Sequence, residues 1–169
     1  SQYKIPVFQR NYRWDRPQWE KLWPSLLDIQ APGKSGNHFM GFLVFVPGLA
    51  QPGQHTRFHL IDGQQRLTTS SLVLAALRNV AREHDQTDLA DEIHNYFLVH
   101  PLKKGEQHFR LLPKEHDQES YLALVSGKGE PTGRMADALE YFEQQLTAQA
   151  KDDPQTLRRM FDVACQRLE

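Results

Sequence analysis

The sequence predicts an α+β fold, with a small mixed sheet formed early in the chain and helices later. Met40 to Val46 is an apolar run of strand length, and Arg57 to Ile61 alternates like a strand that ends at a turn. Tyr3 to Phe8 predicts another short strand, limited by Pro6. Later in the chain apolar residues recur at helical spacing, as at positions 135, 139, 142 and 146.

Two helices are predicted in the first half of the chain. The first follows Asp15, an N-cap residue with Pro17 in the first helical turn, and continues through Leu27. Pro24 predicts a kink or a split within it. The second runs roughly from Leu67 to His84 and is apolar almost all round, so we expect it at the centre of the fold.

The second half of the chain predicts mainly helices. Apolar residues at positions 89, 93 and 97 mark one helix. His108 to Leu112 is expected to be extended, and Glu115 to Val125 helical. Gly and Pro make Lys128 to Gly133 a linker, and two amphipathic helices are expected after it.

Length and charge set modest bounds on function. The 169 residues suffice for one domain, or for one domain with a helical appendage. Lys and Arg number 20 against 21 Asp and Glu, so a net charge of −1 gives no overall attraction to DNA. The N-terminal residues 1–23 are locally positive, with five cations against Asp15 and Glu20. This patch suits phosphate, or else forms a solvated face.

Several protein classes are excluded by residue content. Cys165 is the single cysteine, so disulfides within the chain and cysteine-based zinc sites are excluded. The eight His residues lack paired metal-ligand spacing on one helix. No apolar run approaches the roughly 20 residues of a membrane span, and no secretory signal precedes Tyr3. We therefore expect a cytoplasmic protein without a membrane partner. We also expect that this sequence is part of a longer chain.

The segment Leu60 to Thr69 places a tight polar turn between an apolar strand and an apolar helix. A helix N-terminus in this position presents backbone N–H groups and positive dipole charge to an anion. Gly63 permits the tight bend, and Arg66 adds a guanidinium suited to phosphate. The same residues also fit a structural role, in which Arg66 pairs with a carboxylate and Asp62 caps the helix.

A second motif, Ile5 to Trp14, combines two Arg, a Gln and three aromatic residues. In order and spacing with the polar turn, it resembles the N-terminal domain of the GmrS/GmrD modification-dependent restriction enzymes and related phage-defence proteins. His38 to Phe45 resembles the second strand of that family, and Phe109 to Pro113 its later conserved region. The resemblance implies a ParB/sulfiredoxin-like nucleotide-binding domain over residues 1–127, then the start of a helical region over residues 128–169.

The resemblance also implies a function. It indicates a domain that binds and hydrolyses a nucleoside triphosphate (NTP) with Mg²⁺, senses modified DNA and controls a nuclease. The family's Asp-Gly-Gln-Gln-Arg signature is matched at positions 62–66. Sulfiredoxins carry a Cys in this turn, whereas the Gln here argues against their chemistry. An HNH-type nuclease domain is expected outside this chain, in the same or a partner chain, and assembly into a homo-oligomer stays open.

The turn supplies the expected catalytic residues Asp62, Gln65 and Arg66. Arg66 is the first candidate for phosphate, supported by the N–H groups of Gly63 to Gln65. Asp62 is a candidate to hold Mg²⁺, or else it caps the turn. Gln65 is a candidate to orient the attacking water and Gln64 to bind phosphate or base, and these two roles can be exchanged.

Other nucleotide-binding candidates are Thr68, whose hydroxyl is near the turn, and Gln9 and Arg10, provided that the N-terminal strand lies beside it. Thr68 also suits a helix-start hydrogen bond, and Phe8 and Trp14 are expected in the core. The DNA-binding candidates are Gln9, Arg10, Tyr12 and Arg13.

Three functions remain open at this point. The first is an NTP-hydrolysing sensor domain of a modification-dependent restriction or phage-defence nuclease. The second is a nucleotide- or DNA-binding switch that does not hydrolyse. The third is a ParB-like adaptor that acts on DNA, against which the near-zero net charge counts.

Overall fold

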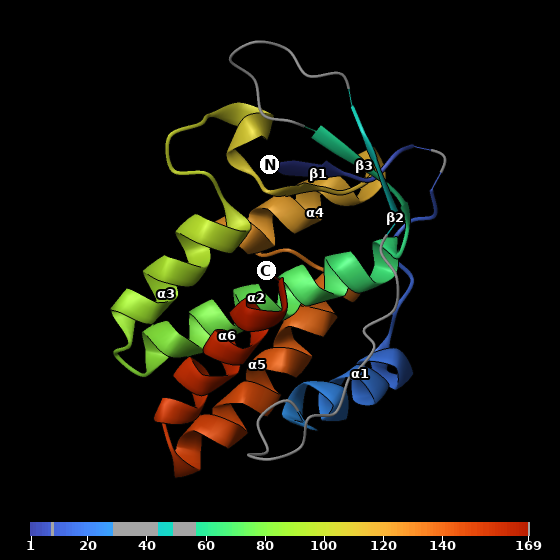
Figure 1. The fold of residues 1–169 in the computed structure, drawn as a ribbon. Helices are drawn as coiled ribbons and strands as arrows, with labels where there is room; N and C mark the ends of the chain where they lie inside the picture. Colours follow the sequence, from blue (N-terminus) through green and yellow to red (C-terminus); the bar gives the residue numbers. More distant parts are fainter. Residues whose placement is uncertain (8, 29–43, 49–56, 169) are drawn as a thin grey trace.

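The computed structural model describes residues 1–7, 9–28, 44–48 and 57–168 (Figure 1). Its sheet has four strands in the order β2-β3-β1-β4. The strands are β1 (Gln2–Lys4), β2 (Val44–Pro47), β3 (Arg57–Asp62) and β4 (Leu111–Leu112). β1 is parallel to both β3 and β4, whereas β2 is antiparallel to β3. The predicted α+β class and the mixed sheet are confirmed.

Helices form most of the rest of the described chain, and α2, α5 and α6 lie below the sheet in Figure 1. The α-helices are α1 (Arg16–Asp28), α2 (Gln64–Glu83), α3 (Thr87–Ile93), α4 (Glu115–Ser126), α5 (Arg134–Asp152) and α6 (Gln155–Leu168). A π-helical segment, η1 (His94–Leu98), extends α3, and η2 (Gly105–His108) is a 3₁₀ turn. None of these helices, within the ranges given, is both long and apolar enough to cross a membrane.

α2 occupies the centre of the hydrophobic core, as predicted. Leu72, Ala76 and Val80 of α2 are fully buried. Phe142 of α5 and Phe161 of α6 belong to the same cluster, so the C-terminal helices share one core with the N-terminal part. α2 begins at Gln64, earlier than predicted, and most of the polar turn motif is therefore its first helical turn.

The N-terminal strand is shorter than the sequence predicts. The Ile5 N–H donates to Leu112 O (2.9 Å), but Pro6 has no N–H and ends the ladder. The Gln9 N–H then donates to Pro6 O (3.1 Å), which closes a turn. β1 therefore ends at Lys4, whereas the sequence predicted a strand from Tyr3 to Phe8, and Phe8 lies outside the described residues.

α1 begins as predicted, directly after Asp15. The Gln18 N–H donates to Asp15 O (3.1 Å), and the Asp15 N–H donates back to Gln18 Oε1 (3.0 Å). The second bond, from the N-cap N–H to the side chain three residues later, is one of the two bonds of a capping box. Pro24 lies inside α1 without splitting it.

Arg78 is a fully buried cation of α2 that binds the end of α4. Its guanidinium donates to the carbonyl oxygens of Leu124 and Val125, which lie in the last turn of α4. Its Nη1 also lies 2.9 Å from His94 Nδ1, so this nitrogen accepts and the neutral ring carries its proton on Nε2. Burial lowers the pKa of Arg78 to about 10. Arg78 therefore fastens both α4 and η1 to the central helix.

Replacing Arg78 by Ala should lower the free energy of unfolding by about 3–5 kcal/mol, because buried carbonyl groups lose their donor and a cavity remains. Denaturant titration followed by circular dichroism measures this loss. The matched control is Arg82→Ala, an exposed position of the same helix that should change stability by no more than about 0.5 kcal/mol. Equal effects of the two substitutions would show that the Arg78 contacts do not hold α4.

Stability should also depend on the protonation of His94. Burial, and then the Arg78 and Arg82 charges, lower the pKa of His94 below its ordinary value of 6.5. The unfolded chain therefore binds this proton more tightly, and the folded state loses stability as the pH falls below about 6.5. A His94→Gln variant keeps an acceptor for Arg78 and should lose less stability than the wild type between about pH 7.5 and pH 5.5. If the free energies of unfolding of the variant and the wild type differed by a constant amount across this pH range, the assignment of the pH dependence to His94 would be contradicted.

Candidate functional site

Three chain segments meet at one edge of the sheet because β1, β3 and β4 are parallel. Their carboxyl ends lie at the same edge. There β1 leads to residues 9–15, which we call the strap, β3 leads to Gly63 and α2, and β4 leads to α4. Ligands of open α/β sheets bind beyond the carboxyl ends of parallel strands. The topology therefore places both sequence motifs at the edge where a ligand site is expected.

Gly63 makes the turn between β3 and α2. Its φ of 91° and ψ of 15° are left-handed, a conformation that favours glycine. It occupies the N-cap position, and the Leu67 N–H donates to Gly63 O (2.9 Å) as α2 begins. Gly63 rather than Asp62 therefore holds the N-cap position that the sequence analysis gave to Asp62 as one alternative.

The first turn of α2 contains Gln64, Gln65 and Arg66, each partly buried. A helix leaves the N–H groups of its first turn without intrahelical partners and carries positive dipole charge there. Arg66 adds its guanidinium to the same turn. The Asp62 side chain, the candidate metal ligand, lies outside the described part of the structure. Among the described residues no three His, Cys, Asp or Glu side chains gather to hold a metal ion.

The Gln65 side chain clamps the strap to α2. Its Oε1 accepts hydrogen bonds from the Arg13 N–H (2.7 Å) and the Trp14 N–H (3.3 Å). Its Nε2 donates to Asn11 O (3.0 Å). Both ends of the amide are thus bound to backbone groups. The sequence analysis left open whether the two motifs meet, and the structure joins them through Gln65.

Tyr12 is a core residue, 7% exposed, and not a surface residue. Its hydroxyl accepts from Trp19 Nε1 (3.0 Å) and lies 2.9 Å from Thr69 Oγ1. Thr69 Oγ1 donates to Gln65 O (2.7 Å), so the Tyr12 hydroxyl donates to Thr69. Burial raises the pKa of Tyr12. The placement of Tyr12 among DNA-binding residues is therefore corrected: its ring and hydroxyl fasten the strap to α1 and α2.

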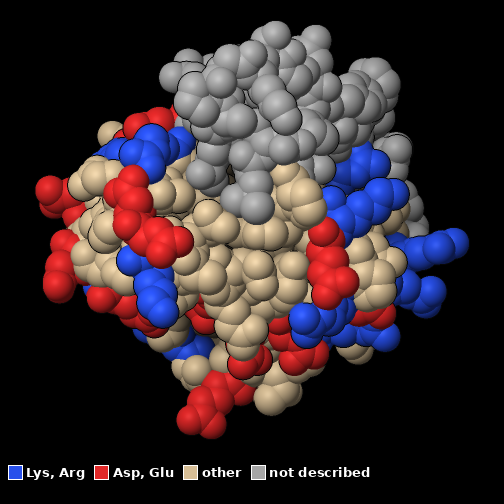
Figure 2. Space-filling model, turned by 90° about the horizontal axis from the view of Figure 1, so that it is seen from below, with Lys and Arg blue, Asp and Glu red and all other residues tan. Residues whose placement is uncertain are grey.

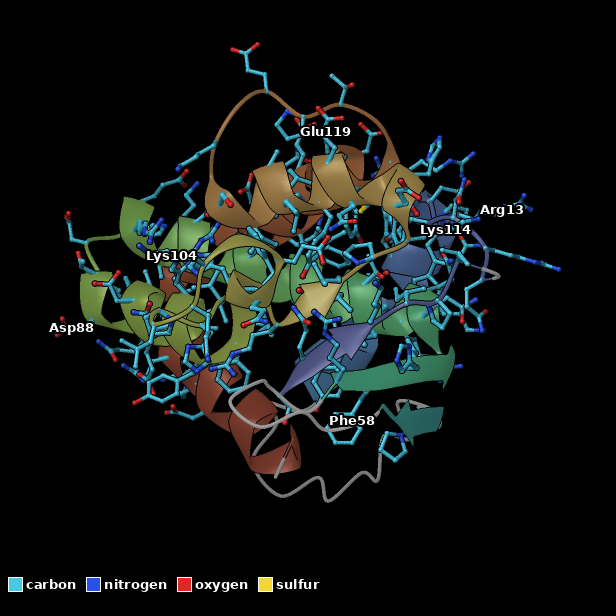
Figure 3. The ribbon with its side chains drawn as sticks, turned by 90° about the horizontal axis from the view of Figure 1, so that it is seen from above. Arg13, Phe58, Asp88, Lys104, Lys114 and Glu119 are labelled. Carbon is cyan, nitrogen blue, oxygen red and sulfur yellow. The ribbon has the colours of Figure 1, made fainter. Side chains whose placement is uncertain are left out.

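The remaining candidates divide by exposure. Arg10 and Arg13 are exposed and Gln9 is partly exposed, whereas Thr68 of α2 is buried, with 3% exposed. Figure 3 shows Arg13 at the margin of the molecule, on the same side as Lys114. On the face drawn in Figure 2, Lys and Arg gather on the right, the side on which α1 lies in Figure 1.

Trp14 packs against the core, as predicted, and Phe8 lies outside the described residues.

Two residues of the later helices also hold the strap. Asp117 Oδ2, in the first turn of α4, accepts from the Tyr12 N–H (2.7 Å). Arg134 Nη1, at the start of α5, donates to Arg13 O (3.0 Å) and lies 3.4 Å from Asp15 Oδ2. The sequence analysis missed both, since no local motif marks them. Only the parallel pairing of β4 could have placed α4 beside the strap.

These features define a small α+β domain whose two sequence motifs join at the carboxyl edge of a mixed sheet. The family described as "GmrSD restriction endonuclease, N-terminal domain" matches residues 1–167. The chain therefore belongs to this family, as its motifs predicted, and is an N-terminal domain of a restriction system. A comparison with curated proteins finds no matching relative.

A Gln65→Leu substitution tests the clamp. It removes three hydrogen bonds to the strap at nearly constant volume, and should lower the free energy of unfolding by about 1–3 kcal/mol. The control is Gln64→Leu, one residue earlier in the same turn, which should stay within about 0.5 kcal/mol of the wild type. Denaturant titration measures both variants. A Gln65 variant as stable as the control would show that the Gln65 hydrogen bonds to the strap do not stabilise the fold.

Proposed function

We propose that this domain binds and hydrolyses a nucleoside triphosphate, and so controls a modification-dependent restriction nuclease. One observation carries the proposal. Gly63 starts α2 in a left-handed conformation at the carboxyl edge of the sheet, and Arg66 follows in the first helical turn. This arrangement places N–H groups, dipole charge and a guanidinium in one helical turn, as phosphate binding requires. Membership of a restriction endonuclease family supports the link to DNA cleavage.

The triphosphate would lie against the first turn of α2. Arg66 would contact two phosphate oxygens, and the N–H groups at the helix start would bind others. Mg²⁺ would accompany the nucleotide, and Asp62, which directly precedes Gly63, is the residue that we propose as its protein ligand. Mg²⁺ commonly keeps several waters and takes few protein carboxylates, so a single Asp suffices.

The two glutamines of the turn take different roles in this proposal. Gln65 has both ends of its amide bound to the strap, so we assign it to positioning the strap over the turn. Gln64 lies at the first position of α2 and is left to orient the attacking water. This exchanges the two roles that the sequence first suggested.

The strap supplies the proposed contacts to DNA. Arg10 and Arg13 are exposed, and two further exposed cations, Arg16 and Lys21, follow in α1. Such cations bind phosphate without reading sequence. Gln9 would add a polar contact to DNA or nucleotide. The nuclease itself, of HNH type, is proposed in the same or a partner chain, and the turn at Gly63 is consistent with the proposed ParB-like relation.

A second candidate function is a nucleotide-dependent switch without turnover. The observation that favours it is the Gln65 amide, which is already occupied by Asn11, Arg13 and Trp14. If Gln65 is the residue that must orient water, this conformation binds nucleotide and does not hydrolyse it. Strap release would then be the regulated step.

Binding and turnover of each NTP with Mg²⁺ separate these functions. Arg66→Ala should weaken binding at least about tenfold, because a charge-assisted contact to phosphate is lost. Arg82→Ala, in the last turn of the same helix, is the control and should bind like the wild type. Calorimetry measures affinity, and phosphate release measures turnover.

Turnover that Gln64→Ala abolishes and Gln65→Ala only reduces would support the hydrolytic assignment. Binding without any turnover would favour the switch. Equal affinity in the wild type and in Arg66→Ala would overturn the proposed phosphate site.

A further inference from the structure

A pocket of about 600 Å³ lies between the strap and the starts of α4 and α5. The strap contributes Asn11, Tyr12 and Arg13, on the side held by Asp117 and Arg134. The described lining does not include the turn at Gly63–Arg66, which binds the strap through Gln65. A volume of this size is within the range of pockets that bind small ligands. The strap therefore separates this pocket from the proposed nucleotide site.

The pocket has a cationic lining. Arg13 and Arg134 both contribute, and the Arg134 side chain is 55% exposed, with its Nη1 3.4 Å from Asp15 Oδ2. Asp117 is the acidic residue in the lining, but its side chain is only 13% exposed and its Oδ2 accepts from the Tyr12 N–H. The groups available to a ligand are therefore mainly positive.

The start of α5 adds hydrogen-bond donors. Gly133, at the N-cap, has a φ of 94° and no side chain caps the helix. A Cβ at Gly133 would meet nothing within 4 Å, so the helix start is open to the pocket. The first helical bond runs from the Asp137 N–H to Gly133 O, and the preceding N–H groups of a helix lack intrahelical partners. These groups complement the arginines in binding an anion.

Neutral polar residues complete the lining. Ser120 and Thr132 belong to it, as does Asn11 of the strap. Asn11 Oδ1 itself is buried away from solvent and has no hydrogen-bond partner among the described residues. The lining thus combines cationic groups with neutral polar residues.

We propose that this pocket binds a small organic phosphate, of about nucleotide size, at a second site that is separate from the turn of α2. Arg134, Arg13 and the start of α5 bind the phosphate, and Ser120 and Thr132 supply polar groups for the rest of the molecule. The strap is shared between the two sites, because the Arg13 N–H is held by Gln65 while its carbonyl is held by Arg134. Occupancy of the pocket thereby affects the position of the strap over the turn.

The test is a titration of this chain with inorganic pyrophosphate and with adenosine monophosphate, followed by backbone amide NMR. The amides of Gly133 and Met135 report the pocket, and those of Gly63 and Gln64 report the turn. Both phosphates should shift the pocket amides saturably in the wild type and in Arg66→Ala. Arg134→Glu should weaken this response at least about tenfold, because it places a carboxylate where the phosphate binds. Adenosine without phosphate should have little effect.

A Glu at the start of α5 interacts favourably with the helix dipole, so the Arg134→Glu variant should fold. Circular dichroism checks this. The matched control is Lys104→Glu, which reverses an exposed charge and should respond like the wild type. Figure 3 shows Lys104 on the side of the molecule opposite to Arg13, a residue of the pocket lining. Unshifted pocket amides in the wild type, or shifts that survive Arg134→Glu, would overturn the proposal. The proposal would also be overturned if a short DNA duplex shifted the pocket amide signals and neither pyrophosphate nor adenosine monophosphate did. If the proposed nucleotide site at the turn alone is wrong, the Gly63 and Gln64 amide signals should not shift while the pocket amide signals do.

Discussion

The parallel pairing of β1 with both β3 and β4 is the constraint on which the rest of the site depends. β1 has three residues, yet it lies between the two strands, and the Tyr3 and Ile5 N–H groups donate to Arg110 O and Leu112 O. Parallel neighbours end at the same edge, so the strap, α2 and α4 must begin close together. Asn11 and Gln65, which are 54 positions apart in sequence, are thereby brought into hydrogen-bond contact.

The strap can follow an irregular path because neighbouring elements bind its backbone. Gln65 binds it from α2, Asp117 from α4 and Arg134 from α5. The Tyr12 hydroxyl adds a buried network that includes Trp19 and reaches α2. Buried polar networks of this kind specify one conformation only when every member is satisfied. Tyr12 and Trp14 of the N-terminal motif thus pack inward and position the strap, whereas Arg10 and Arg13 are exposed.

Hydrophobic periodicity predicted most of this fold, because helices such as α2 and α5 bury continuous stripes. Periodicity could not predict the early end of β1, which follows from a hydrogen bond that Pro6 cannot make. The polar turn motif located the start of α2, although Gly63 and not Asp62 holds the N-cap. Tyr12 was misplaced because an aromatic residue beside arginines gives no local sign of its burial. The roles of Asp117 and Arg134 depend on tertiary pairing alone.

The first turn of α2 differs in charge from the first turns of α4 and α5. α4 carries Glu115 and Asp117 in its first turn, and α5 carries Asp137, as the helix dipole favours. The first turn of α2 has no acidic residue and contains Arg66, and the helix dipole disfavours a cation at a helix start by about 0.3–1 kcal/mol. In the proposed site, a phosphate would interact favourably with both this guanidinium and the dipole.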